Sequence, residues 1–105
     1  MNKGVFELQA NVCKLLSHPK RLEILCLLEK GEKSFGELQE ATGLSKPNLS
    51  QHLTLLRTRG VVTARREGQH LHFSVADPRI HTACGLMRAV LCERIKTEQR
   101  IAGAK

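Results

Sequence analysis

The stretch GLSKPNLSQHLTLLRTRG, residues 43–60, decides the fold, because it combines two patterns within one short helix. Leu49, Leu53 and Leu56 recur at i, i+4 and i+7, which is the spacing of one buried helical stripe. Between the leucines stand hydrogen-bonding side chains of small or middle size, namely Lys46, Asn48, Ser50, Gln51, His52 and Thr54. A helix face that only contacts solvent usually consists of Glu and Lys. The different residue types on this face indicate that it binds a ligand.

Local signals set the ends of this helix and of the one before it. Ser45 is a favourable N-cap, and Gly60 follows the last turn. Residues 34–37 fit the S-x-x-E capping box, which opens a preceding helix at about 35–42 that ends at Gly43. Two short helices joined by a glycine-containing turn form a helix-turn-helix.

The rest of the chain extends this unit on both sides. Helical spacing predicts a first helix over about 5–17 and a second over about 19–30, whose run ILCLL is typical of a central buried helix. The β-type run at 61–66, a turn, and the alternating segment 70–75 predict a β-hairpin, or wing. A last helix follows over about 78–100. The order α-α-α-α-β-β-α is that of a winged helix-turn-helix, mostly α with a β-hairpin wing.

The composition indicates that a single copy of the chain buries too little apolar surface and needs a partner. The 105 residues, expected to form a single domain over 1–105, include three Phe and no Tyr or Trp, so the core is small. The last helix carries an apolar stripe that lies beyond that core, formed by Ile80, Cys84, Met87, Leu91 and Ile95. We expect this stripe to be a dimer surface.

The charge of the chain is unevenly distributed. The formal net charge is +7, yet residues 1–44 hold six basic and six acidic residues and are neutral. Residues 45–72 hold five basic residues against Glu67 alone, together with three histidines. This skew is the pattern of a polyanion-binding protein, although an ordinary basic surface would also produce it.

Several other classes of protein are excluded. No apolar run has the length of a signal peptide or a membrane span, so we expect a soluble, cytoplasmic protein that does not contact a membrane. Four cysteines are then free thiols rather than disulfides. The chain has no phosphate-binding glycine loop, paired catalytic carboxylates or C-x-x-C, so we expect neither an enzyme nor a cofactor. A protein-interaction module remains an alternative.

The sequence resembles the ArsR/SmtB family of bacterial transcriptional repressors over nearly its whole length. The matching stretches are LLSHPKRLEILCLL, FGELQEATGLSKPNLSQHLTLLRTRGVV and REGQHLHFSVADPR. The resemblance implies a homodimer that forms through the first and last helices. It also implies that the dimer binds double-stranded DNA at an imperfect palindrome with half-sites about one helical turn apart.

The polar face of the quoted helix has the chemistry that a DNA-reading helix needs. Asn and Gln can pair with adenine, and Ser and His can donate or accept hydrogen bonds in the major groove. We therefore expect base or phosphate contacts from Lys46, Asn48, Ser50, Gln51, His52 and Thr54. Wing residues Arg65, Arg66 and His70, with His72 near them, are expected to reach phosphates or the minor groove. Arg57 and Arg59 are secondary candidates, since cations also suit a helix C-terminus. The alternative is a polar surface helix without a ligand.

The cysteines suggest what such a repressor senses. Cys26 and Cys92 match by position the two cysteines of the BigR/SqrR-type sensors of sulfane sulfur and oxidants, which implies that these thiols bridge and release DNA. Residues 33–38 lack the cysteines of the arsenic and cadmium sensors, and Arg79 and Val90 replace histidines of the zinc sensors. Cysteine is also a common core residue, so simple packing remains open for each thiol.

A metal site is the competing interpretation. Cys13 on the first helix could meet Cys84 and Cys92 on the last helix of a dimer, and three thiolates would suit As, Cd or Zn. His81 lies three residues before Cys84, which is a weak chelating pattern. The operator, the regulated genes and the choice between sulfur species and metal ion are not encoded in any pattern we find.

Overall fold

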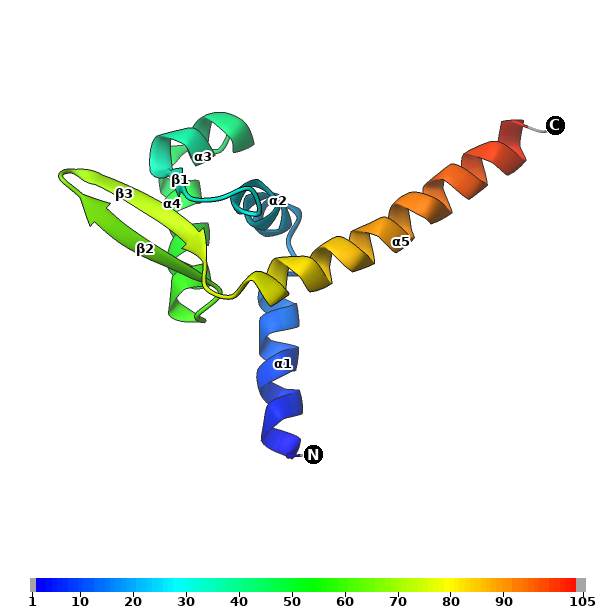
Figure 1. Ribbon diagram of the computed structural model, residues 1–105, viewed down its shortest axis with the longest axis horizontal. Helices are drawn as coiled ribbons and strands as arrows, with labels where there is room; N and C mark the ends of the chain where they lie inside the picture. The colour runs from blue at the N-terminus through cyan, green and yellow to red at the C-terminus, as the bar shows by residue number, and fades with distance from the viewer. Residues whose placement is uncertain (1, 104–105) are drawn as a thin grey trace.

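The computed structural model describes residues 2–103, which form five α-helices and three β-strands (Figure 1). In chain order the elements are α1 (Lys3–Leu15), α2 (Pro19–Leu28), β1 (Lys33–Ser34), α3 (Phe35–Thr42), α4 (Lys46–Thr58), β2 (Val62–Glu67), β3 (His70–Val75) and α5 (Pro78–Gly103). This order confirms the predicted winged helix-turn-helix and adds β1, a strand that no pattern in the sequence predicts.

The strands form one antiparallel sheet in the order β1-β3-β2. β2 and β3 make the wing, in which Glu67 pairs with His70 across a two-residue turn. Gly68 in that turn has a φ of +62°, a left-handed conformation that glycine adopts without strain. β1 pairs Lys33 with Phe73, far along the chain, and two residues are too few to carry a periodic pattern.

The core lies where α4 meets α2, α3 and the base of the wing. Leu49, Leu53 and Leu56 are no more than 2% exposed, which confirms the predicted stripe. They share one cluster with the other buried apolar side chains, which are Leu15, Ile24, Leu25, Leu28, Leu38, Val61, Val62 and Phe73. Burying a side chain of this kind stabilises the fold by roughly 1.5–3 kcal/mol. The cluster therefore fixes the rotation of α4 about its own axis.

The helix ends of the helix-turn-helix are those that the sequence predicts. Ser34 Oγ accepts the Glu37 N–H at 3.1 Å, while Glu37 Oε1 accepts the Ser34 N–H at 3.0 Å. Gly43 ends α3 in the left-handed region, and Ser45 Oγ accepts the Asn48 N–H at 3.3 Å to cap α4. The short turn between the two helices is thus set by local chemistry.

A polar clasp, formed by His18, Arg21 and His52, joins α1, α2 and α4. The Arg21 guanidinium donates through Nη1 to the Leu15 carbonyl at 3.0 Å and through Nε to His52 Nδ1 at 3.1 Å. The rings of His18 and His52 meet edge to face, with centroids 4.6 Å apart, and His18 Nδ1 accepts the Lys20 N–H. His52 is therefore partly buried against α2, and its Nδ1 is occupied by Arg21.

The predicted central buried helix is buried on one face only. Ile24, Leu25 and Leu28 of α2 are buried, whereas Leu22 and Cys26 on its other side are exposed. The run of apolar residues suggested burial all round because it does not show which neighbours the helix has.

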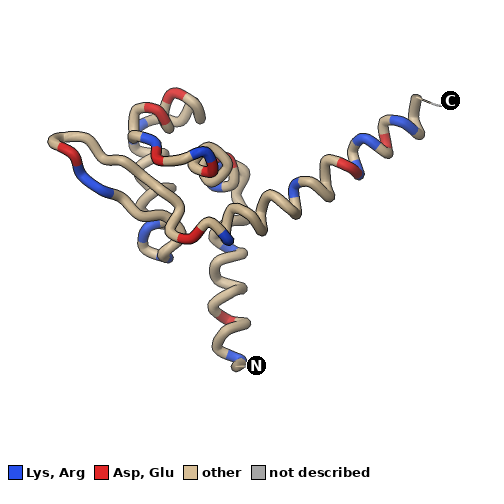
Figure 2. Tube along the Cα trace, viewed as in Figure 1, with Lys and Arg blue, Asp and Glu red and all other residues tan. Residues whose placement is uncertain are grey.

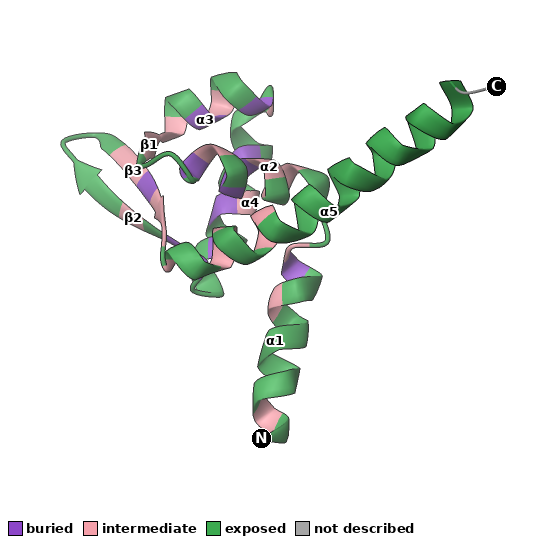
Figure 3. Cartoon of the chain, turned by 45° about the vertical axis from the view of Figure 1, so that its right-hand side comes forward, coloured by how far each residue is buried: buried purple, intermediate pink, exposed green. Residues whose placement is uncertain are grey.

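Helices α1 and α5 project from the core and leave apolar surface uncovered (Figures 1 and 3). α5 has no buried residue, and its side chains Leu86, Met87 and Val90 are 67%, 65% and 58% exposed. The radius of gyration is 16.3 Å, against about 13 Å for a compact domain of this length. None of the described helices is both long and apolar enough to span a bilayer.

The clasp predicts an acid-dependent loss of stability. Burial, the neighbouring His18 and the Arg21 cation together lower the pKa of His52 below its ordinary value of 6.5. The unfolded chain therefore binds more protons than the folded chain below about pH 6.5. The free energy of unfolding should fall as the pH drops from there through the folded-state pKa of His52. Above about pH 6.5 this group should not change the stability. Denaturant unfolding between pH 7.5 and 5 measures this fall, and His52→Gln, which can still accept from Arg21, should reduce it. An NMR titration midpoint of His52 at or above 6.5 would contradict the prediction.

Candidate nucleic-acid interface

The outer face of α4 presents a row of hydrogen-bonding side chains to solvent. Lys46, Ser50, Gln51 and Thr54 are exposed, as is Asn48, opposite the buried leucine stripe. Because the core fixes how α4 is rotated, these five side chains point away from the protein without any further constraint. His52 is the exception among the predicted contacts, since its Nδ1 is engaged by Arg21.

A groove runs between this face of α4, the start of α3 and the tip of the wing; we call it the α3–wing groove. Its volume is about 610 Å³, and it is lined by residues 34–36, by Lys46 and Ser50 of α4, and by residues 69–71 of the wing. Lys46 and Ser50 of α4 and His70 of the wing, three of the predicted DNA contacts, thus meet around one space. No local sequence pattern brings His70 to the two residues of α4.

The two wing arginines have different surroundings. Arg65 donates to Glu32 through Nε at 2.8 Å and through Nη2 at 2.7 Å, and its Nη1 reaches Glu67 at 2.7 Å. These hydrogen bonds lower the pKa of both carboxyls and raise the pKa of Arg65. Arg66 is exposed, and no carboxylate within residues 2–103 forms a salt bridge with it. Figure 2 shows the acidic residue at the wing tip beside this basic pair.

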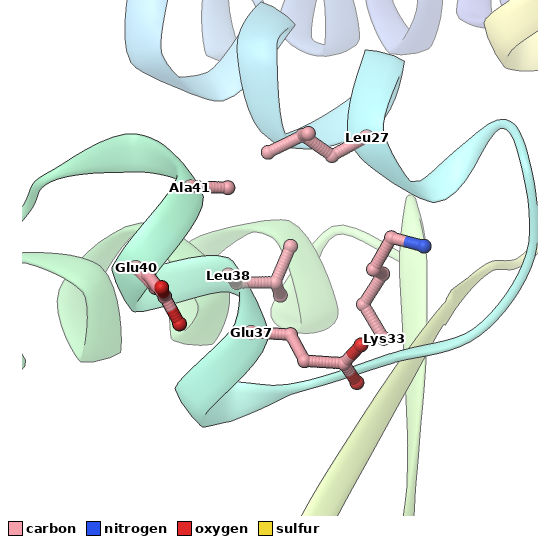
Figure 4. A pocket seen from close by; sticks show the side chains of 6 residues that line it. All are labelled: Leu27, Lys33, Glu37, Leu38, Glu40 and Ala41. Atoms are coloured by element: carbon pink, nitrogen blue, oxygen red, sulfur yellow. The ribbon is translucent and has the colours of Figure 1, made fainter.

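Two carboxylates of α3, those of Glu37 and Glu40, line a different hollow from the α3–wing groove. A second hollow of about 370 Å³ between α2 and α3 is lined by Leu27, Leu38 and Ala41, with Glu37, Glu40 and Lys33 around it (Figure 4). The apolar side chains face the space between the two helices in that view. A polyanion would be repelled by Glu37 and Glu40, so this hollow is not part of the candidate interface.

The cysteines are free, and Cys13, Cys26 and Cys92 are exposed. Cys84 is partly buried and packs against the edge of the core, as expected for a packing residue. Within the described part of the chain, no three potential metal ligands of the His, Cys, Asp or Glu type come together. The predicted set of Cys13, Cys84 and Cys92 would therefore need a second chain.

One polar contact joins α2 to α5 near two of the thiols. Glu29, at the end of α2, lies 3.5 Å from Arg88 Nη2 and 3.7 Å from His81 Nδ1. Cys26 is one helical turn before Glu29, and Cys92 is one turn after Arg88. Residues three or four apart share a helix face, so each thiol lies on the face of its helix that carries this contact.

Comparison with known proteins gives one consistent answer. Residues 18–64 match the family described as "Bacterial regulatory protein, arsR family". An uncharacterized HTH-type transcriptional regulator of Mycobacterium tuberculosis is 43% identical over 91 residues, which cover 86% of this chain and 80% of that protein.

Two solved structures share the fold at more than 30% identity. The homodimeric winged helix-turn-helix DNA-binding domain of a possible ArsR-family regulator from Mycobacterium bovis superposes with a TM-score of 0.81, at 31% identity, covering 90% of this chain and 87% of that one. The transcriptional repressor BigR from Xylella fastidiosa gives 0.72, at 33% identity, covering 88% and 91%. The chain belongs to the ArsR family of bacterial regulatory proteins and is a transcriptional regulator, not an enzyme.

Proposed function

We propose that the chain is a homodimeric repressor whose α4 reads duplex DNA and whose Cys26 and Cys92 control release. The observation that carries the DNA-binding part is the exposed polar face of α4, held outward by the leucine stripe and bordered by a groove without carboxylates. Asn48 and Gln51 would pair with adenine edges in the major groove, and Ser50 and Thr54 would contact bases or phosphates. Lys46, Arg66 and His70 would face the sugar-phosphate backbone.

The proposed dimer forms through α1 and α5. Val5, Phe6 and Leu8 of α1 and Leu86, Met87 and Val90 of α5 are exposed in a single chain, and exposed apolar side chains gathered on one helix are typical of an interaction surface. A closed dimer would cover it with a second copy of the same surface. The similar Mycobacterium bovis domain is described as homodimeric, which supports the same assembly here. Two copies of α4 would then meet two half-sites of an imperfect palindrome.

DNA binding can be tested by selecting preferred duplexes from a random library and measuring affinity by anisotropy at several salt concentrations. Gln51→Ala should remove the preference for one base at one position of the duplex. The binding free energy should weaken by about 1–3 kcal/mol for the selected duplex and stay unchanged for other duplexes. Arg66→Gln should weaken binding to every duplex and reduce the salt slope by about 1.

Arg65→Gln is the matched control for Arg66→Gln, because Glu32 and Glu67 already compensate the charge of Arg65. It should change the salt slope less than Arg66→Gln does. A wild-type chain that binds no duplex even in dilute buffer would refute the DNA-binding proposal.

The dimer proposal predicts that Val90→Glu converts the chain to a monomer in sedimentation equilibrium, because it places a carboxylate in the apolar side of α5. Affinity for the selected duplex should then fall by roughly 100-fold or more, since the second half-site is no longer held nearby. Arg94→Gln on the same helix should remain dimeric. A wild-type chain that sediments as a monomer at micromolar concentration would exclude this assembly.

The sensing part rests on the position and exposure of Cys26 and Cys92. The thiolate of one cysteine would attack the outer sulfur of a low-molecular-weight persulfide, forming a protein persulfide and releasing the low-molecular-weight thiolate. The second cysteine would then displace hydrogen sulfide and close a disulfide. If both cysteines carry a persulfide, loss of hydrogen sulfide leaves a trisulfide. Because it contains an extra sulfur atom, the trisulfide can span a wider gap between α2 and α5 than the disulfide can. The positional match of Cys26 and Cys92 to the cysteines of the BigR/SqrR group supports this part of the proposal, and the transcriptional repressor BigR is among the similar solved structures.

Anaerobic treatment with glutathione persulfide should produce a Cys26–Cys92 bridge that peptide mass spectrometry detects, together with loss of DNA affinity. Cys26→Ser and Cys92→Ser should each keep DNA binding and resist release, whereas Cys13→Ser, on exposed α1, should respond as the wild type does. Release by Cd(II) while Cys26 and Cys92 stay unmodified, abolished by Cys13→Ser or Cys84→Ser, would instead favour the metal sensor.

A further inference from the structure

The outer part of α5 is held to the rest of the chain at one place. Apolar side chains of the first two turns of α5 pack against the core, whereas residues 86–103 are all exposed (Figure 3). In the described part of the chain, Arg88 is the last residue of α5 whose side chain makes a polar contact with another element, and its partner is Glu29 at the end of α2. Cys92 lies one turn beyond this contact. The Glu29–Arg88 pair therefore decides how closely the part of α5 that carries Cys92 follows α2.

Gly85 leaves open the space in which this pair forms. Glu29 Oε2 lies 3.5 Å from Arg88 Nη2, and Glu29 Oε1 lies 3.7 Å from His81 Nδ1. His81 is one turn before Gly85 and Arg88 is three residues after it, so the two residues flank Gly85 on one face of α5. A Cβ added to Gly85 would lie 3.6 Å from Arg88 Nη2 and 3.8 Å from Glu29 Oε1. Glycine is a poor residue for a helix interior, and here it allows two charged groups to meet directly over the helix surface.

The pair links the two helix faces that carry the proposed sensor thiols. Cys26 precedes Glu29 by three residues, and Cys92 follows Arg88 by four. An exposed ion pair contributes little to the stability of a fold. Its effect on a reaction within the chain can be larger than its effect on folding, because such a reaction depends on how often its two groups meet.

The two steps of the proposed sensor reaction depend on this contact to different degrees. In the first step one thiolate attacks the outer sulfur of a low-molecular-weight persulfide that arrives from solution, and the low-molecular-weight thiolate leaves. That step needs only one exposed cysteine. In the second step the other thiolate attacks the persulfidated Sγ, a sulfur–sulfur bond forms between the two cysteines, and hydrosulfide leaves. Only the second step requires α2 and α5 to hold the two sulfurs near each other.

We propose that Glu29 and Arg88 are positioning residues for this second step, because they hold the Cys92 segment of α5 against α2. The inference rests on the proposed sensing function and names the residues that set the rate at which the Cys26–Cys92 bridge closes.

Arg88→Gln tests this difference between the two steps. After anaerobic mixing with glutathione persulfide, samples alkylated at timed intervals and examined by mass spectrometry give the amounts of free, persulfidated and bridged protein. The rate of bridge closure should fall about three- to fivefold, as expected for the loss of one exposed ion pair, and the persulfidated form should accumulate. In chains that also carry Cys26→Ser or Cys92→Ser, Arg88→Gln should leave the rate of persulfide formation within about twofold.

Three further variants separate the effect of the pair from a general disturbance of α5. Glu29→Arg combined with Arg88→Glu reverses both charges and should restore bridge closure to within about twofold of the wild type. Gly85→Leu keeps both charged residues but places a longer side chain against them, so it should slow closure as Arg88→Gln does. Arg94→Gln is the matched control, since no salt bridge within residues 2–103 includes Arg94, and it should close at the wild-type rate.

Bridge closure at or above the wild-type rate in Arg88→Gln or in Gly85→Leu would overturn the inference. A charge-reversed chain that closes as slowly as Arg88→Gln would overturn it as well. Each of these results would leave the proposed sensing function intact. A wild-type chain that forms no bridge between Cys26 and Cys92 would instead contradict the sensing function itself.

Discussion

The burial of Leu49, Leu53 and Leu56 is the constraint on which the rest of the structure depends. A helix whose three leucines are held in a core has one rotation only, because a turn of 100° would bring Ser50 or His52 and the residues beyond them into the apolar cluster. The same rotation sends Gln51 and Thr54 into solvent. The outward polar face is thus a consequence of core packing, and it exists before any ligand arrives. A site preformed in this way loses little conformational entropy on binding.

The clasp of Arg21, His18 and His52 adds a second restraint at the side of α4. It uses Nδ1 of neutral His52 as an acceptor, so one ring nitrogen of a residue predicted to contact DNA helps to position the helix that carries the other predicted contacts. The ion pairs of Arg65 restrain the wing in a similar way. Arg65 is oriented by Glu32 and Glu67, and exposed ion pairs of this kind contribute little to stability. Their effect is to orient the wing and to leave Arg66 as its uncompensated charge.

Most of the fold could be predicted because its signals are local. Ser45, Gly43 and the capping box at residues 34–37 each act within one helical turn, and the leucine stripe repeats inside a single helix. The errors concern features that depend on distant residues. β1 exists only through pairing with β3, and the exposure of Cys26 depends on what covers the outer side of α2.

The candidate site was predictable in its residue types and only partly in its arrangement. The polar face of α4 follows from helical periodicity, but the orientation of His52 follows from α2, and the pairing of Arg65 follows from Glu32 in another part of the chain. The α3–wing groove joins three separate segments.

Helix α2 connects the proposed sensor to the proposed DNA-binding face. At its start Lys20 donates to the Thr42 carbonyl of α3 at 2.8 Å and Arg21 donates to His52 of α4. At its end Glu29 contacts Arg88 of α5. One short helix of 10 residues, about 15 Å long, therefore holds the helix-turn-helix at one end and the proposed dimer helix at the other.

A direct bridge between Cys26 and Cys92 would require their Cα atoms to lie about 4.4–6.8 Å apart, in one of a few allowed orientations. Such a bridge would impose a fixed distance and angle on α2 and α5 and so change their arrangement wherever the reduced helices differ from it. Because α5 would also form the dimer, that change would alter the separation of the two copies of α4. DNA with half-sites at a fixed spacing tolerates little change of that kind, so a covalent event beside Glu29 would be sufficient to end binding without disturbing the leucine core.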